Sequence, residues 1–207
     1  MAIAQPDKQA HTAHDAQLAP FGRLTDAAQW LAACQGAAPA REPQRIRAVI
    51  FAEQETPLPA AETAARRAEA ALNVVTVTDY SQAYNLGAAS ADAEIDAGAD
   101  LLIPGGEERA RVPAVVMATM TQTEPVVIVG KQRSVEDWKR EVTAIRDAMF
   151  RARNLEGMEL VESCQSTVLA ATVGFIARAA ERRTPLLVDA PLTATAALLA
   201  ERDNPGV

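Results

Sequence analysis

The sequence predicts an α/β fold in which parallel strands are joined by crossover helices, a doubly wound and Rossmann-like arrangement. Short apolar, β-branched runs alternate along the chain with longer segments of helical periodicity. The runs are continuously apolar rather than alternating, which is typical of strands buried on both faces of a parallel sheet. The predicted strands span residues 46–52, 72–77, 99–103, 125–129 and 185–189.

Helices are predicted between these strands, at residues 24–34, 60–71, 82–97, 135–151, 167–183 and 192–202. The pattern is clearest in 135–151, where apolar residues recur at spacings of three and four and form one stripe. Ser134 and Asp137 form a capping-box pattern at the start of this helix. Pro191 suits the first turn of the last helix.

The chain of 207 residues is long enough for one domain with a substantial core. Residues 1–17 are polar and lack the apolar stretch of a signal peptide, so they are predicted to form a disordered or frayed tail. Residues 18–207 are predicted to form a single α/β domain that begins with a small helical segment.

The net charge and the short length of the apolar runs argue against nucleic-acid and membrane partners. A net charge of −7 repels phosphate backbones, so no nucleic-acid partner is expected. No apolar run approaches the ~20 residues that span a bilayer, so no membrane partner is expected. Cys34 and Cys164 lie far apart and suggest reduced thiols, which favours a cytoplasmic protein.

Histidine is scarce, and this limits the possible chemistry. His11 and His14 are the only histidines, and both fall in the predicted tail. No metal site or cofactor is therefore expected, and no Ser-His or Cys-His pair can form in the core. Any catalysis would depend on carboxylates, lysine or arginine, and the sequence leaves the catalytic residue unknown.

In doubly wound sheets, ligands bind beyond the carboxyl ends of the strands. This rule selects the loops at 53–59, 104–111, 130–133 and 190–193. In the second loop, the backbone of Gly105 and Gly106 could approach a phosphate, and Arg109 and Arg111 could clamp it. The alternative is a strand-ending turn in which glycine supplies a positive φ.

Two further candidate binding residues follow later predicted strands. Gly130 opens a loop before a helix N-terminus, and Lys131 and Arg133 add positive charge there. The alternative is that both basic residues are solvated on a surface loop. Asp189 follows the last predicted strand. Its carboxylate could bond a ribose or the backbone amides of the following helix, and both interpretations stay open.

Several segments, in order along the chain, together resemble the nicotinate-nucleotide–dimethylbenzimidazole phosphoribosyltransferase family of cobalamin synthesis. They span residues 20–24, 30–36, 47–52, 96–103, 124–130, 145–151, 174–177, 182–189 and 195–202. The resemblance implies a parallel α/β sheet with a small helical subdomain and a homodimer. It also implies phosphoribosyl transfer from nicotinate mononucleotide to 5,6-dimethylbenzimidazole, with a glutamate near the C-terminus as general base.

The departures from the family pattern fall on its functional loops. The chain has Glu53 and Gln54 where the family has an Asp-His-Gly-Val turn, and a shortened segment follows. Arg109 and Arg111 stand where the phosphate loop should end in Asn-Thr-Thr, and the second glycine loop reads 130–134. The segment with the catalytic glutamate has no counterpart.

The resemblance therefore implies a shortened, divergent member with reduced or lost catalysis. The alternative is a non-catalytic relative that binds a nucleotide, a benzimidazole, or a partner such as a full-length relative.

Overall fold

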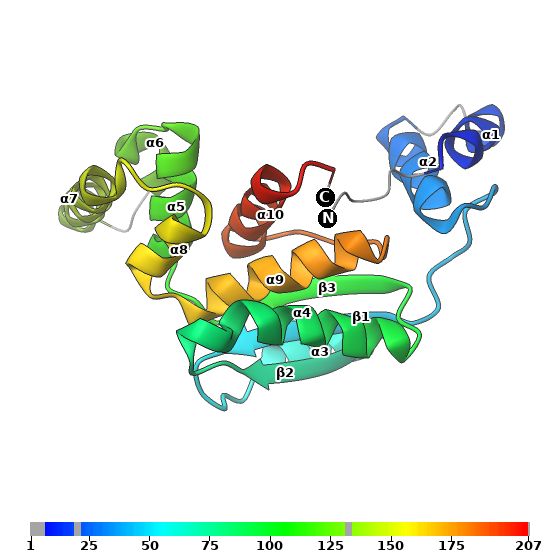
Figure 1. The fold of residues 1–207 in the computed structure, drawn as a ribbon, viewed down its shortest axis with the longest axis horizontal. Helices are drawn as coiled ribbons and strands as arrows, with labels where there is room; N and C mark the ends of the chain where they lie inside the picture. Colours follow the sequence, from blue (N-terminus) through cyan, green and yellow to red (C-terminus); the bar gives the residue numbers. More distant parts are fainter. Residues whose placement is uncertain (1–6, 19–21, 131–133, 207) are drawn as a thin grey trace.

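A computed structural model of the chain describes residues 7–18, 22–130 and 134–206. Its centre is a parallel sheet in the order β2-β1-β3 (Figure 1). The strands are β1 (Ile46–Ala52), β2 (Ala71–Thr76) and β3 (Leu101–Gly106). Val49 of β1 lies opposite Asn73 of β2 and Pro104 of β3. The parallel pairing and the crossover helices confirm the predicted α/β fold class.

Helices make up most of the remaining chain. They are α1 (Lys8–Leu18), α2 (Arg23–Gln35), α3 (Pro59–Arg67), α4 (Tyr80–Asp96), α5 (Arg111–Thr121), α6 (Pro125–Val129), α7 (Val135–Ala152), α8 (Gly157–Cys164), α9 (Thr167–Glu181) and α10 (Pro191–Asp203). All six predicted helices are present, whereas α1, α5 and α8 were not predicted. None of the helices in the described part of the chain is long and apolar enough to cross a bilayer.

The predicted strand at 125–129 is wrong, because this segment is helix α6. Pro125 occupies the first turn, where its fixed φ suits a helix, and Gly130 ends the helix with φ 59°. Val126 and Val127 are exposed. A five-residue apolar run carries too little periodicity to separate a strand from a helix, and packing against α5 and α7 decides the outcome.

The predicted strand at 185–189 is reduced to one parallel bridge, between Leu186 and Leu102 of β3. The Leu102 amide donates to the Pro185 carbonyl at 2.9 Å, and the Leu187 amide donates to the Leu102 carbonyl at 2.9 Å. Leu187 and Val188 are exposed, so this segment flanks the sheet without extending it.

Burial on both faces is also wrong for β2, most of whose residues are exposed. Of the helices, α3 makes the main packing contact with β2. β3 lies at the other edge of the sheet but is more buried, because α9 and α10 pack on it. The exposure of β2 therefore follows from how little of it the helices cover.

The N-terminal prediction also differs from the structure. Where a frayed tail was expected up to residue 17, residues 8–18 form α1, which packs on α2. Asp7 accepts hydrogen bonds from the amides of Gln9 at 2.8 Å and Ala10 at 3.2 Å, so it caps the new helix. Residues 1–6 lie outside the described part.

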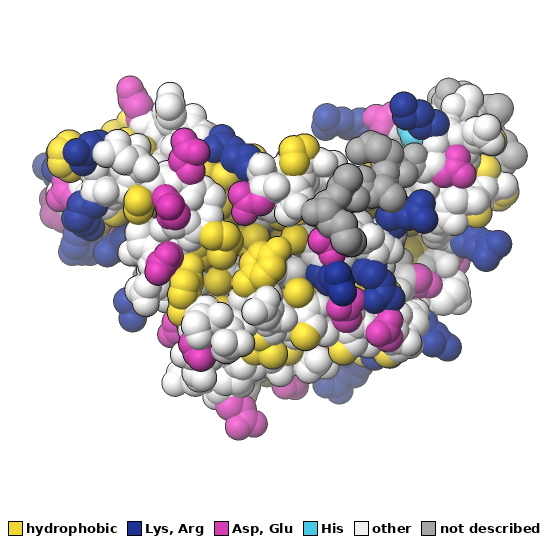
Figure 2. Space-filling view, viewed as in Figure 1, with side chains coloured by type: hydrophobic (Ala, Val, Ile, Leu, Met, Phe, Trp, Pro, Cys, Tyr) yellow, Lys and Arg dark blue, Asp and Glu magenta, His cyan; other side chains and the backbone are white. Residues whose placement is uncertain are grey.

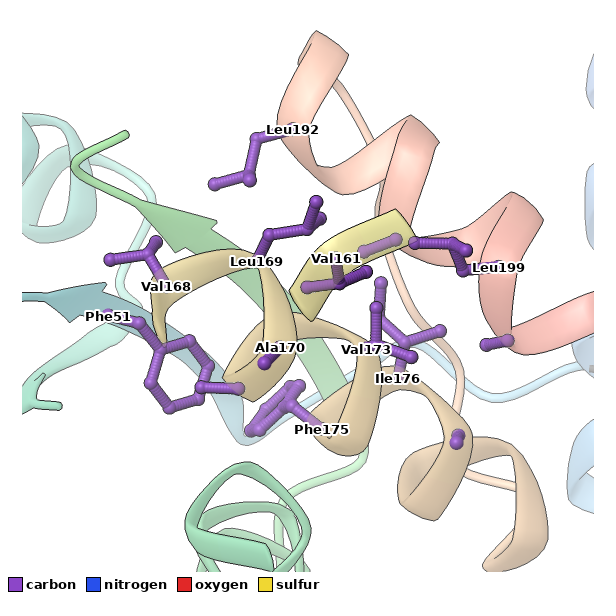
Figure 3. Close-up of a cluster of buried hydrophobic side chains, with 14 of the residues drawn as sticks. Phe51, Val161, Val168, Leu169, Ala170, Val173, Phe175, Ile176, Leu192 and Leu199 are labelled. Carbon is purple, nitrogen blue, oxygen red and sulfur yellow. The ribbon is translucent and has the colours of Figure 1, made fainter. Parts of the chain in front are cut away.

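Helix α9 lies at the centre of the core, between the sheet, α4 and α10 (Figure 3). Nearly all its residues are buried, including Leu169, Val173 and Ile176. Phe175 meets Phe51 of β1 edge to face, with ring centroids 5.7 Å apart. Ser166 caps the helix by accepting from the Leu169 amide at 3.0 Å. Strands β1 and β3, and the loops that follow them, therefore pack against a buried helix.

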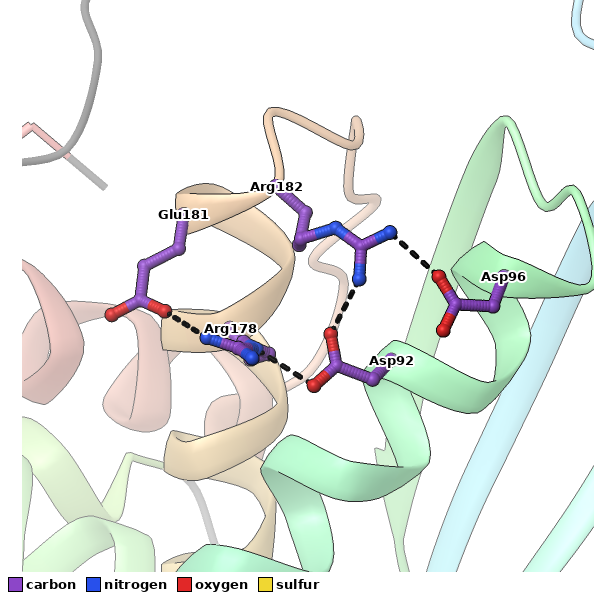
Figure 4. Close-up of polar contacts among 5 residues, drawn as sticks. All are labelled: Asp92, Asp96, Arg178, Glu181 and Arg182. Atoms are coloured by element: carbon purple, nitrogen blue, oxygen red, sulfur yellow. Dashed lines mark hydrogen bonds and ion pairs between the residues drawn. The ribbon is translucent and has the colours of Figure 1, made fainter.

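An ion-pair network joins the far ends of α4 and α9 (Figure 4). Arg178 and Arg182 both donate to Asp92, at 2.9 and 2.6 Å, and Arg182 also reaches Asp96 at 2.7 Å. Burial alone would raise the pKa of Asp92, but the hydrogen bonds from the two guanidinium groups together outweigh it and lower that pKa. The two arginines thus bind carboxylates of a neighbouring helix.

Asp92→Asn is expected to lower the Tm by no more than about 4 °C at pH 7, because the three side chains are only half-buried and water weakens their ion pairs. An unfolded aspartate has a pKa near ~3.9, so the stabilisation is complete above that pH. It is lost as the pH falls through the lower pKa of the folded state. Thermal unfolding of both proteins from pH 7 to about pH 3 should show the two Tm values converging. A gap that widens in acid would contradict this assignment.

Candidate functional site

The carboxyl ends of β1 and β3 open onto a pocket of about 610 Å³, which we call the edge pocket. It is lined by residues after β1 and β3, by the first turn of α5 and by the turn between α8 and α9. These are Ala52, Glu53, Gln54, Thr56, Glu107, Glu108, Arg109, Val112, Cys164, Gln165 and Ser166. The predicted loops at 53–59 and 104–111 therefore meet at one place.

A second hollow of about 610 Å³ continues this edge to the end of β2. It shares Glu53 and Gln165 with the edge pocket and adds the residues between β2 and α4. Thr167 at the start of α9 lines it as well, and its hydroxyl is buried without a hydrogen-bond partner among the described residues. All three strands thus contribute their carboxyl ends to the site, as doubly wound sheets do.

The edge pocket is rich in carboxylates. Glu53, Glu107 and Glu108 line it, and Arg109 is the basic residue among its lining residues. The Ser166 hydroxyl donates to Glu108, whose other carboxylate oxygen accepts from the Arg109 amide at 2.7 Å. A protein carboxylate therefore already lies at the capped start of α9. An anionic ligand entering this pocket meets net negative charge.

Cys164 brings a thiol to the edge pocket, at the end of α8. Burial raises its pKa, and the charge of Glu108 raises it further, while a hydrogen bond with Ser163 lowers it. The thiol is therefore protonated near neutral pH, which disfavours a role as nucleophile.

Gly105 and Gly106 are the last residues of β3, paired with Ile50 and Phe51 of β1, rather than members of a free loop. The next amide, that of Glu107, donates to the Phe51 carbonyl at 2.9 Å. A Cβ on Gly106 would lie 2.5 Å from Val168 and 2.7 Å from Leu192. Gly106 thus permits close packing of β3 against α9 and α10.

Arg109 and Arg111 are separated by the start of α5. Arg109 lines the edge pocket, whereas the Arg111 guanidinium binds Glu141 of α7 through Nε at 3.0 Å and Nη2 at 2.6 Å. These hydrogen bonds hold the pKa of Glu141 below its usual range. The two arginines share a wide hollow of about 630 Å³ outside the edge pocket, but the Arg111 guanidinium is occupied there by Glu141.

Arg111 lies instead beside a smaller, largely apolar hollow of about 280 Å³, which we call the side pocket. Its walls come from α5, α6, α7 and α10, including Val129 and Pro191. Val129, next to the predicted loop at 130–133, and Pro191, within the predicted loop at 190–193, are therefore brought near Arg111. Residues 131–133 themselves lie outside the described part. Gly130 ends α6 next to this pocket.

Asp189 is exposed, and its side chain makes no hydrogen bond to any described residue. The start of α10 is held by Thr193, whose hydroxyl accepts from the Ala190 amide at 3.2 Å and donates to the Ala190 carbonyl at 3.0 Å. The Asp189 carboxylate was expected to bond either a ribose or the backbone amides of α10, and the hydrogen bonds to those amides are not formed.

Metal ligands do not cluster in the described ranges, where no group of three His, Cys, Asp or Glu side chains is placed to hold a metal ion. His11 is exposed on α1, and the side chain of His14 lies outside the described residues.

Three residues of the site escaped sequence reasoning. Ser166 stands before an apolar helical run, a cap signal that was available in the sequence. Thr167 follows it directly. Glu141 had no signal, because its partner Arg111 lies 30 positions away.

Comparison with known proteins gives a consistent assignment. A family model described as phosphoribosyltransferase matches residues 59–207. The nicotinate-nucleotide–dimethylbenzimidazole phosphoribosyltransferase of Mycobacterium ulcerans is 35% identical over 271 positions, covering 99% of this chain and 76% of the relative. The corresponding protein of Corynebacterium glutamicum is 44% identical over 140 positions, covering 65% of this chain and 39% of the relative.

The fold has a solved counterpart. The crystal structure of the nicotinate-nucleotide–dimethylbenzimidazole phosphoribosyltransferase from Thermus thermophilus superposes with a TM-score of 0.81 at 20% identity, covering 97% of this chain and 79% of that one. The alignment of 271 positions with the M. ulcerans protein is longer than this 207-residue chain, so that relative carries segments without a counterpart here. On these grounds the chain belongs to the nicotinate-nucleotide–dimethylbenzimidazole phosphoribosyltransferase family.

Proposed function

We propose that this protein is a phosphoribosyltransferase of strongly reduced activity, acting on nicotinate mononucleotide and 5,6-dimethylbenzimidazole. The observation that carries the proposal is the charge of the edge pocket. Glu53, Glu107 and Glu108 line it beside Arg109. Transfer from a mononucleotide needs donors for a phosphate, and a pocket that presents mainly carboxylates weakens that interaction.

The reaction also needs a base for the azole nitrogen, and this is the step that the edge pocket could still supply. Glu53 and Glu107 are the candidates, because both line the pocket, whereas Glu108 is engaged by Ser166. A general base contributes about 10²–10⁴-fold to a rate. Arg109 is the candidate for the phosphate, and Gly105 supports the loop that presents it.

The test is direct synthesis of α-ribazole phosphate. Purified protein is incubated with both substrates, and product is measured by chromatography. We expect product at a rate lowered by at least about 10²-fold relative to the M. ulcerans relative, in line with loss of phosphate donors. Arg109→Gln should abolish the residual activity, and Arg146→Gln, an exposed arginine on α7, should leave it unchanged. A rate equal to that of the relative would overturn the proposed loss.

The second candidate function is nucleotide or partner binding without catalysis. It is favoured by the contact between Glu108 and Ser166, which places a fixed carboxylate at the start of α9. Calorimetric titration with nicotinate mononucleotide separates the candidates. Binding without product identifies a nucleotide-binding relative, and absence of both leaves the version that binds a protein partner.

The expected partner is a second copy or a full-length relative. Large apolar side chains are exposed, among them Leu24 and Trp30 on α2, and Figure 2 shows hydrophobic side chains gathered over α9, between α4 and α10. Light scattering should give twice the chain mass, and a mass of 22.0 kDa would contradict a homodimer.

We place the protein in the cytoplasm because Cys34 and Cys164 are free thiols, which a reducing compartment preserves. Cell fractionation would test this placement.

A further inference from the structure

The start of α9 is a place where an anion would bind, and a side chain of this protein already occupies it. A helix N-terminus attracts negative charge through its unpaired amides and its dipole. Here the Ser166 hydroxyl accepts from the Leu169 amide at 3.0 Å and donates its own proton to the carboxylate of Glu108. Glu108 reaches the buried Ser166 across 58 positions of the sequence. The anion at the start of α9 is therefore internal.

Glu108 is held in this place through both of its carboxylate oxygens. One oxygen accepts from the Ser166 hydroxyl, and the other accepts from the Arg109 amide at 2.7 Å. The side chain is half-buried and lines the edge pocket. Because both oxygens have donors within the protein, the carboxylate keeps its position without any ligand. Glu108 therefore gives the edge pocket a carboxylate of fixed position.

The other charges of the edge pocket do not offset Glu108. Glu53 and Glu107 add two carboxylates to the lining, and Arg109 is the basic residue among the lining residues. A phosphate monoester carries a charge of about −1.5 to −2 near pH 7. Placing it among these carboxylates brings like charges together, which disfavours binding.

The two remaining glutamates suit a different group of a ligand. Unlike Glu108, Glu53 and Glu107 have side chains that make no hydrogen bond or ion pair with any described residue. A carboxylate beyond a strand end accepts hydrogen bonds from ribose hydroxyls in doubly wound folds. Glu53 also lines the neighbouring hollow with Thr167, whose buried hydroxyl has no partner among the described residues. The site thus offers polar groups to a sugar.

We propose that the edge pocket binds a pyridinium nucleoside in preference to the 5′-phosphate of the same nucleoside, and that Glu108 sets this preference. The ribose hydroxyls donate to Glu53 and Glu107, and the positive charge of the pyridinium ring is attracted by the same carboxylates. Glu108 occupies the place at α9 where the phosphate would bind, and its charge repels that phosphate. The volume of about 610 Å³ accommodates a nucleoside.

The choice of a pyridinium ligand rests on the proposed function, and the preference gives a physical reason for the low activity expected with the mononucleotide. The two proposals nevertheless fail separately, because this one is measured as binding and the other as product. Slow formation of α-ribazole phosphate without a preference for the nucleoside would overturn the binding preference alone. A preference for the nucleoside in a protein that forms no product would overturn the transferase activity alone.

The experiment titrates nicotinate riboside and nicotinate mononucleotide, which differ in the phosphate alone, into the full chain by calorimetry. We expect the riboside to bind at least about tenfold more tightly, because like charges in one site oppose binding of the mononucleotide. The difference should shrink as NaCl rises from about 0.05 to about 0.5 M, since salt screens the repulsion. Equal binding, tighter binding of the mononucleotide, or no binding of the riboside at up to on the order of 10 mM overturns the proposal.

A matched pair of variants tests the role of Glu108. Glu108→Gln removes the charge but keeps an oxygen for the Arg109 amide, so it should tighten mononucleotide binding about tenfold and leave riboside binding unchanged. Glu159→Gln makes the same charge change at an exposed position of α8 that lines neither hollow of the site, and it should change neither affinity. A Glu108→Gln variant that keeps the full preference for the riboside contradicts the role of Glu108.

A third variant tests the recognition of the ribose. Glu53→Ala should weaken riboside binding about tenfold, because a charged hydrogen-bond acceptor is lost. Unchanged riboside binding would contradict the placement of the sugar against Glu53. Thermal unfolding of each variant shows whether it folds, and the salt dependence measured on the natural protein tests the repulsion without any substitution.

Discussion

Phe175→Ala is expected to lower the free energy of unfolding by about 3–5 kcal/mol, the range for truncation of a buried phenylalanine. Phe175 is fully buried on α9, and its ring packs at 71° to that of Phe51 on β1. The substitution removes this contact and leaves a cavity between the central helix and the sheet. Backbone on both sides belongs to regular elements, so the cavity cannot easily close.

Chemical denaturation of both proteins measures this effect directly. Phe150→Ala is the matched control, because Phe150 is 67% exposed and its main contact is the Arg153 guanidinium, 4.4 Å from the ring centre. We expect the control to lose about 1 kcal/mol at most. Equal losses in the two variants would contradict the central place of α9 in the core.

How far the fold follows from sequence is clear from particular elements. The predicted strands at 46–52 and 72–77 match the bounds of β1 and β2 to within one residue. Their β-branched residues favour the extended backbone of a strand. Helix α7 begins where Ser134 and Asp137 predict, with the Asp137 amide donating to the Ser134 hydroxyl at 3.0 Å. Residues 125–129 have the same composition as a strand, and tertiary packing made them a helix.

The location of the site could be predicted from the sequence, but the contacts between its side chains could not. Strand ends predicted the loops that form the edge pocket, because the topology of parallel sheets fixes where those ends lie. The pairing of Ser166 with Glu108 joins residues 58 positions apart, and that of Arg111 with Glu141 joins residues 30 positions apart. No local rule in one sequence encodes such pairs, so Arg111 was expected to clamp a phosphate, whereas in the structure its guanidinium binds Glu141.

A second large effect is expected at the crossing of α4 and α9, where Gly87→Ala should destabilise the protein by about 3 kcal/mol. A Cβ on Gly87 would lie 1.9 Å from the Ala171 carbonyl oxygen, and a Cβ on Gly174 would lie 2.1 Å from that of Tyr84. Each helix therefore contacts the backbone of the other through a glycine, and the helices must separate to admit a methyl group.

The sign of this result is informative, because helix propensity alone predicts the opposite. Alanine in a helix interior is favoured over glycine by about 1 kcal/mol, so Gly87→Ala would stabilise a helix that packs loosely. Gly105→Ala is the control, since its Cβ would meet Ile50 at an ordinary 3.4 Å. Denaturant titration of the three proteins measures the change. A stabilised Gly87→Ala would mean that α4 and α9 lie farther apart than in the structure, and it would contradict the packing of the scaffold that carries both pockets.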